Sequence, residues 1–132
     1  MRQRGAQAAF AIALVLVAVV PAAGQDAARA APLLDVPYVA QTEALCGGAS
    51  VAMVQRYWGA RNVSPGDFST LVDGRRGGIP TSLLVEAVRQ HGWQAFALTG
   101  TPTLAHHHLE SGRPLIALLQ VAPHRRHYVV VV

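Results

Sequence analysis

The sequence contains few of the residues that metal, disulfide and nucleic-acid sites require. Its 132 residues include a single cysteine, Cys46, and only 14% of the residues are charged. One cysteine excludes an internal disulfide framework and any zinc site built from several cysteines. All 11 basic residues are arginine and no run of them exceeds two, so the chain lacks the dense basic patch that neutralises several phosphates. We expect no nucleic-acid partner and no cofactor.

The composition is instead that of a small folded domain. Hydrophobic residues make up 52% of the chain, against a formal net charge of only +4. This balance excludes a disordered, highly solvated polymer. A length of 132 residues allows one domain at most.

The N-terminal residues have the three-part pattern of a secretory signal peptide. Arg2 and Arg4 precede 13 uninterrupted apolar residues at positions 8–20, and small residues follow at 22–24. As a helix the apolar run would rise only about 20 Å, short of the ~30 Å hydrocarbon core of a bilayer. We therefore predict a signal peptide at 1–24, a linker at 25–32 and one domain at 33–132. The protein would be secreted or periplasmic, without stable membrane insertion after signal cleavage.

The mature part of the chain predicts helices first and antiparallel strands later, which is an α+β arrangement. Apolar residues at spacings of 3 and 4 predict a helix from Cys46 that Gly59 ends. Ser64 followed by Pro65 and Asp67 predicts the capped start of a short second helix. Residues 74–78 predict a flexible loop, and Thr81 a cap for a third helix.

The remaining residues predict one strand, then a helix, and then a C-terminal hairpin of two strands. We expect a strand at 93–98, a fourth helix at 103–111, and strands at 114–121 and 127–132 joined by residues 122–126. His106, His107 and His108 in the fourth helix fan out by about 100° each, so they indicate a solvated face rather than a metal site.

Cys46 lies where a helix start would activate a thiol. Unpaired N–H groups and the positive end of the helix dipole favour thiolate over thiol at this position. Gly47 and Gly48 follow at once and leave the approach to the sulfur open. His127 is an imidazole on a separate strand, and such a Cys–His pair is the layout of nucleophilic acyl transfer. Gln41 and the backbone N–H of Cys46 would then form an oxyanion hole.

Two other interpretations of these residues stay open at this point. Cys46 could be a small buried hydrophobic residue, the commonest fate of a free cysteine. Alternatively, Cys46, His124 and His127 could converge on a zinc ion across the hairpin.

The segment around Cys46 resembles a known peptidase family. Residues 35–59, DVPYVAQTEALCGGASVAMVQRYWG, look like the nucleophile segment of the bacteriocin-processing (double-glycine) cysteine peptidases, family thirty-nine of the papain-like clan. The later segments LESGRPLIALL at 109–119 and HYVVVV at 127–132 resemble this family's x-G-x-P strand and catalytic-histidine strand. The resemblance covers the mature chain from about Leu33. It implies a papain-like fold with Cys46 as nucleophile, His127 as general base and Gln41 as the oxyanion glutamine.

The sequence departs from the family pattern in two places. Gly48 stands where the family often has proline. The family's third catalytic residue, an Asp on a strand beyond the histidine, has no counterpart up to Val132. We therefore expect a chain that is C-terminally incomplete, with the family's last strands missing and weak activity as it stands.

The leading hypothesis is an exported cysteine peptidase-like domain that hydrolyses peptide bonds, with a peptide or protein as its substrate. The alternatives are a non-catalytic peptide-binding module on the same fold and a metal-binding protein built on Cys46 and the histidines. The sequence leaves open the substrate sequence, including whether Gly-Gly is cut, and the oligomeric state.

Overall fold

The protein is described by a computed structural model that covers residues 32–42 and 44–132. The predicted signal peptide and all of the predicted linker except Pro32 lie outside these residues. The elements in chain order are α1 (Cys46–Tyr57), the 3-10 helix η1 (Pro65–Leu71), α2 (Thr81–Gln90), α3 (Pro102–Glu110), β1 (Leu115–Ala122) and β2 (Arg125–Val131). The predicted α+β class is confirmed.

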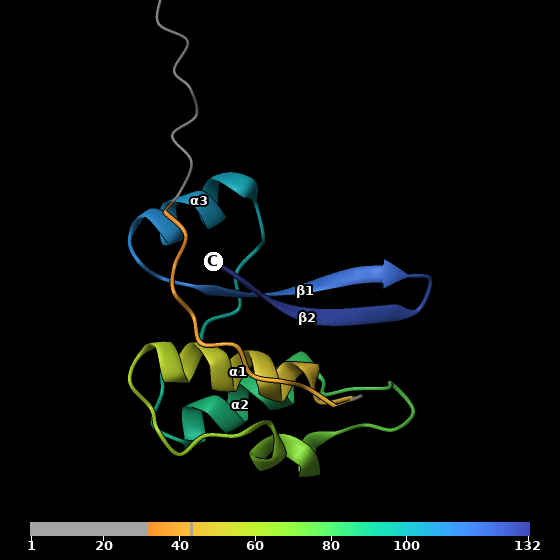
Figure 1. The fold of residues 1–132 in the computed structure, drawn as a ribbon. Coiled ribbons are helices and arrows are strands. Elements are labelled where there is room, and N and C mark those ends of the chain that lie inside the picture. Colours follow the sequence, from red (N-terminus) through yellow and green to blue (C-terminus); the bar gives the residue numbers. More distant parts are fainter. Residues whose placement is uncertain (1–31, 43) are drawn as a thin grey trace, which may run out of the picture.

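The β1–β2 hairpin has α3 on one side and the other helices on the opposite side (Figure 1). Helices α1 and α2 lie on one side of it together with η1, and α1 packs against β2. Helix α3 lies on the other side, where it contacts β1. None of the described helices is both long and apolar enough to cross a membrane.

The hairpin is tighter than the sequence predicted. Strand β2 begins at Arg125, two residues before the expected start, and only Pro123 and His124 form the turn. His124 adopts a left-handed backbone with φ of 60°, which the residue after a proline takes in tight turns. The register pairs Leu118 with Tyr128 and Leu119 with His127, and it shifts between Gln120 and Ala122.

One continuous core joins the helices to the hairpin. Its buried members come from every part of the fold except α3 and β1: Val39, Val51, Ala52, Val63, Phe68, Ile79, Leu84, Val88 and Tyr128. Tyr128 connects the layers, since its hydroxyl donates to the Ile79 carbonyl (3.2 Å) and lies 2.7 Å from Thr81 Oγ1. The residue next to the predicted base is therefore anchored to the start of α2.

Gly47 and Gly48 serve packing, which differs from the role that the sequence suggested. Both are buried. A Cβ on Gly48 would lie 2.9 Å from the Pro65 carbonyl oxygen, and one on Gly47 would lie 3.2 Å from Tyr128 and Leu84. The absence of side chains lets η1 and β2 approach the start of α1. The glycines thus bring neighbouring elements close to Cys46 rather than opening the approach to its sulfur.

The predicted cap of the second helix is confirmed, and that of the third is wrong. Ser64 and Asp67 form a capping box, in which the Ser64 N–H donates to the Asp67 carboxylate (2.8 Å). The cap of α2 is Pro80, one residue before Thr81. The Thr81 hydroxyl is instead hydrogen-bonded to the Tyr128 hydroxyl, so that this buried phenol has a polar partner.

The strand predicted at 93–98 does not form. These residues have no regular secondary structure, although Trp93 and Ala95 pack against the core. A strand needs a neighbour for its backbone groups, and the only strand ladder among the described residues joins β1 to β2. The Ala95 carbonyl accepts from the Arg89 guanidinium instead (2.6 and 3.0 Å).

Candidate functional site

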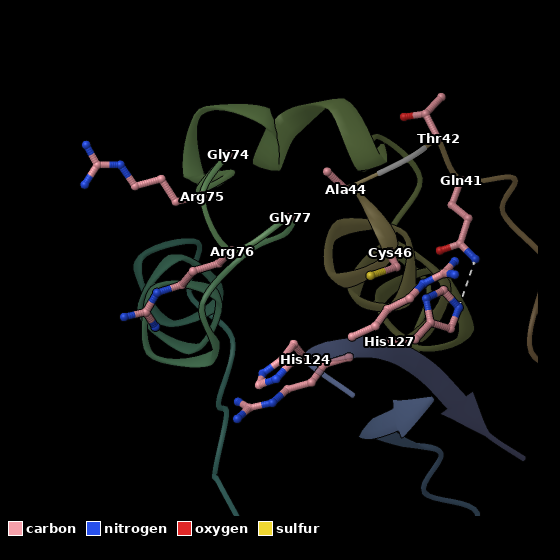
Figure 2. Close-up of a pocket in the computed structure, with 12 residues that line it drawn as sticks. Gln41, Thr42, Ala44, Cys46, Gly74, Arg75, Arg76, Gly77, His124 and His127 are labelled. Carbon is pink, nitrogen blue, oxygen red and sulfur yellow. Dashed lines mark hydrogen bonds between the residues drawn. The ribbon is translucent and has the colours of Figure 1, made fainter. Parts of the chain in front are cut away.

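A cleft of about 610 Å³ lies at the end of the hairpin where the turn is, beside the start of α1 (Figure 2). Its lining comes from three segments that are far apart in the sequence: Gln41, Thr42, Ala44 and Cys46; residues 74–77; and residues 124–127. This volume is typical of a ligand-binding site. All three residues predicted for catalysis, Gln41, Cys46 and His127, line this one cleft.

Cys46 is the first residue of α1 and is partly buried. A turn closed by the Leu45 N–H to the Thr42 carbonyl (3.2 Å) leads into the helix, and Ala44 within it has a left-handed backbone with φ of 64°. No side chain caps the helix, and its first turn holds no acidic residue. Within residues 32–42 and 44–132, the first backbone N–H groups of α1 are therefore without a capping side chain and can face a negatively charged atom near Cys46.

The side chains of His127 and Gln41 are neighbours in the cleft (Figure 2). Gln41 Nε2 is 3.5 Å from His127 Nε2. An amide nitrogen only donates, so His127 Nε2 accepts in this arrangement and the proton of a neutral ring sits on Nδ1. Turning the amide by 180° gives the second arrangement, in which Nε2–H donates to the Gln41 oxygen and Nδ1 is the free base.

Cys46 and His127 share the cleft without bonding to each other. Among residues 32–42 and 44–132, Gln41 is the one side chain hydrogen-bonded to the His127 ring, and no hydrogen bond reaches Cys46 Sγ. The ion pairs of the same residues are Arg76–Asp73 and His106–Glu110, so no described carboxylate pairs with His127.

A second hollow of about 110 Å³ adjoins the cleft at Cys46. Ile79, Pro80, Leu118 and Tyr128 give it an apolar wall, and Thr81 a polar one. Four residues line both cavities: Cys46, Arg76, Gly77 and Arg126. Cys46 thus lies where a wide polar cleft meets a smaller hollow with a mixed apolar and polar lining.

The wall formed by residues 74–77 was missed as a site element, because a Gly-Arg-rich stretch predicts a flexible loop. In the structure the residues that flank this loop are joined by a hydrogen bond, in which the Asp73 N–H donates to the Gly78 carbonyl (2.9 Å). The Asp73 carboxylate also lies 3.3 Å from Arg76 Nε. The signal in the sequence was Asp73 followed by glycines, which favours a closed turn.

The histidines do not assemble a metal site in the described residues. His124 lines the same cleft as Cys46 and His127, yet no group of three His, Cys, Asp or Glu residues in 32–42 and 44–132 is arranged to hold a metal ion. His106 pairs with Glu110 on α3 (3.2 Å).

Comparison with known proteins identifies one family. The model of the Peptidase_C39 like family matches residues 33–132. No curated protein and no solved structure matches the sequence.

Proposed function

The chain belongs to the Peptidase_C39 like family, and on this premise we propose that its domain is a cysteine peptidase that attacks peptide carbonyls with Cys46. The observation that carries the proposal is the convergence of Cys46, His127 and Gln41 on one cleft from segments up to 86 positions apart. A nucleophile, a base and an amide donor in one cavity are the parts that acyl transfer needs.

His127 would act first as base and then as acid. The base needs the arrangement in which His127 Nε2–H donates to the Gln41 oxygen, because Nδ1 is then the ring nitrogen that is free to take the proton of the Cys46 thiol. The thiolate attacks the carbonyl carbon, and the imidazolium returns its proton to the leaving amine as the C–N bond breaks. Water, deprotonated by the same imidazole, then hydrolyses the thioester and frees the thiol.

Stabilisation of the oxyanion would come from the start of α1. The backbone N–H of Cys46 lies at the N-terminal end of α1, where the dipole favours negative charge. The Gln41 amide would be the second donor. With the amide oxygen held by His127 Nε2–H, the NH2 group of Gln41 would remain free to donate to the tetrahedral intermediate.

The two cavities would hold the substrate on either side of the reacting bond. The narrow hollow beside Cys46, at about 110 Å³, has room for one side chain of modest size. The wider cleft would take the remaining peptide. We also propose that the domain acts outside the cytoplasm, as the signal-like residues 1–24 indicate. N-terminal sequencing of the secreted or periplasmic protein should then return a start near Gln25, whereas an intact Met1 in the membrane fraction would contradict export.

A direct test combines hydrolysis with thiol labelling. The protein should cleave a quenched fluorescent peptide library, and Cys46→Ala should abolish the cleavage. At pH 6 a low concentration of iodoacetamide should label Cys46 quickly and stoichiometrically. A slow thiol would contradict nucleophilic catalysis, and protection that chelation removes would indicate bound zinc.

The second candidate is a non-catalytic peptide-binding module. It is favoured by one observation, that no hydrogen bond joins Cys46 to His127 among the described residues. Binding of peptides without turnover, unaffected by Cys46→Ala, would support this alternative.

A further inference from the structure

The turn at residues 73–78 reaches the segment that leads into Cys46. A Cβ on Gly78 would lie 3.9 Å from the carbonyl oxygen of Ala44, which precedes Cys46 by two positions. Gly77 lines both the cleft and the smaller hollow, as Cys46 does. A ligand that fills both cavities at Cys46 therefore has Gly77 as a neighbour as well.

This turn faces the cleft with its backbone. The side chains of Arg75 and Arg76 extend away from Cys46 (Figure 2). Gly77 has no side chain, and a Cβ built there would meet no described atom within 4 Å. The space beside its peptide group is therefore open, and a glycine lets another main chain approach closely.

Asp73 holds the turn from its first residue. Its carbonyl accepts from the Arg76 N–H (3.1 Å) and from the Gly78 N–H (3.3 Å), and its own N–H donates to the Gly78 carbonyl (2.9 Å). Its carboxylate accepts from the Arg75 N–H (3.0 Å) and lies 3.3 Å from Arg76 Nε. One residue thus fixes the turn through both its backbone and its side chain.

The peptide group of Gly77 is left out of this set of contacts. Within residues 32–42 and 44–132, neither its N–H nor its carbonyl takes part in a backbone hydrogen bond. A donor and an acceptor on one exposed residue without a side chain match the main chain of an extended peptide, which carries the same pair. The turn therefore suits a peptide backbone and not one particular side chain.

We infer that Gly77 binds the main chain of the substrate beside Cys46, and that Asp73 is the positioning residue that holds Gly77 in place. The inference rests on the peptide site of the proposed function and adds how that site holds the peptide. Asp73 acts through the turn, so it governs the binding of the peptide and leaves the reactivity of the thiol unchanged.

The test replaces main-chain groups of the ligand one at a time. The probe is the fluorescent library peptide that binds the full-length Cys46→Ala protein most tightly, since this protein cannot turn it over. Each peptide N–H of the probe is exchanged in turn for an ester oxygen, which removes a donor and keeps every side chain. Kd is measured by anisotropy for each ester and for the parent peptide.

At one position the ester should weaken binding about fivefold to tenfold, as loss of one hydrogen bond does. In the same background, Asp73→Ala should raise the Kd of the parent peptide about tenfold and bring the ester penalty at that position close to one. Asp73→Asn keeps an acceptor for the Arg75 N–H and should fall between. Gly77→Ala should also raise Kd, because its methyl group would occupy the space of the peptide.

Two control variants match these changes away from the site. Asp67→Ala removes a carboxylate that accepts from the Ser64 N–H (2.8 Å). Gly92→Ala places a methyl group in open space on a backbone with φ of 82°, close to the 67° of Gly77. Neither Asp67 nor Gly92 lines either cavity, so both variants should keep the Kd and the ester penalty.

The thiol supplies a readout that a general loss of structure would change. With Cys46 present, Asp73→Ala should raise KM and leave the rate of alkylation by iodoacetamide within about twofold of wild type. Slower alkylation would overturn the inference, because the effect would then lie at the thiol. An ester series without a sensitive position, a penalty that survives Asp73→Ala, an equal loss of affinity in Asp67→Ala, or no peptide binding would overturn it too.

The same measurements separate this inference from the proposed function. A sensitive position that depends on Asp73, without hydrolysis by the protein that keeps Cys46, would leave the main-chain site standing and refute the peptidase proposal. Hydrolysis of a peptide that has no sensitive position would do the reverse.

Discussion

The amide nitrogen of Gln41 lies 3.5 Å from Nε2 of His127. This contact joins the segment before α1 to β2, across 86 positions of the sequence. In a cysteine peptidase the imidazole has to keep one nitrogen toward the thiol while the other is held by a partner. Gln41 is that partner in the described residues, so one side chain serves both as the proposed oxyanion donor and as the group that orients the ring.

Substitution of Gln41 separates these two roles. Gln41→Ala should lower kcat about 10²- to 10³-fold through loss of an oxyanion donor, and it should also slow alkylation of Cys46, because His127 loses the partner of its ring. Gln41→Glu supplies an acceptor for Nε2–H without an amide donor, so it should restore alkylation and leave hydrolysis impaired. If Gln41→Ala left both rates unchanged, Gln41 would have neither of the two proposed roles.

His127 and His124 line the same cleft, which gives a matched pair of variants. His127→Ala should slow the reaction of Cys46 with iodoacetamide at pH 6 to 7, since the proton acceptor is gone. His124→Ala, which removes an imidazole from the hairpin turn, should leave the rate within about twofold of wild type. Equal effects of the two changes would mean that the histidines act only through the charge of the cleft.

Gly48 should tolerate no side chain. A methyl group there would lie 2.9 Å from the Pro65 carbonyl oxygen and 3.1 Å from Phe68 Cβ, and both atoms belong to the packed face of η1. Gly48→Ala should therefore lower the free energy of unfolding by about 1–3 kcal/mol, as overpacking does. Gly66→Ala is the control, because its Cβ would meet only Ser64 Oγ at 3.5 Å. Urea denaturation compares the two, and a stable Gly48→Ala protein would contradict the close packing of η1 on α1.

The sequence predicted those features that depend on local chemistry. The helix starting at Cys46 and the Ser64–Asp67 capping box are written in neighbouring residues. The strand predicted at 93–98 was wrong because the local sequence does not show whether a hydrogen-bonding neighbour is present. The role of the 74–77 wall was missed because it depends on contacts between segments distant in the chain. That Cys46, His127 and Gln41 share a cleft agrees with the family resemblance rather than with any local pattern, and their catalytic roles stay predictions.

We expect Tyr128 to position both of the proposed reacting groups, Cys46 and His127, and its hydroxyl offers a sharp test of this. The residue follows His127 on β2, and its ring lies against the first turn of α1, where a Cβ on Gly47 would be 3.2 Å away. Its hydroxyl is bonded to the Ile79 carbonyl and to Thr81 Oγ1. Tyr128→Phe keeps the ring but leaves a buried carbonyl unpaired, at a cost of about 1–3 kcal/mol in the free energy of unfolding.

Tyr57→Phe is the matched control for this change. The Tyr57 hydroxyl donates to the Gly112 carbonyl (3.0 Å), away from the cleft, so its loss should cost about 1 kcal/mol of stability. Both variants should melt at a lower Tm. Only Tyr128→Phe should also slow Cys46 alkylation and peptide hydrolysis at a temperature where both proteins remain folded, because only Tyr128 adjoins His127 and contacts the start of α1. If the two variants lose stability alike and keep wild-type thiol reactivity, the hydroxyl of Tyr128 holds the fold together without aligning the site.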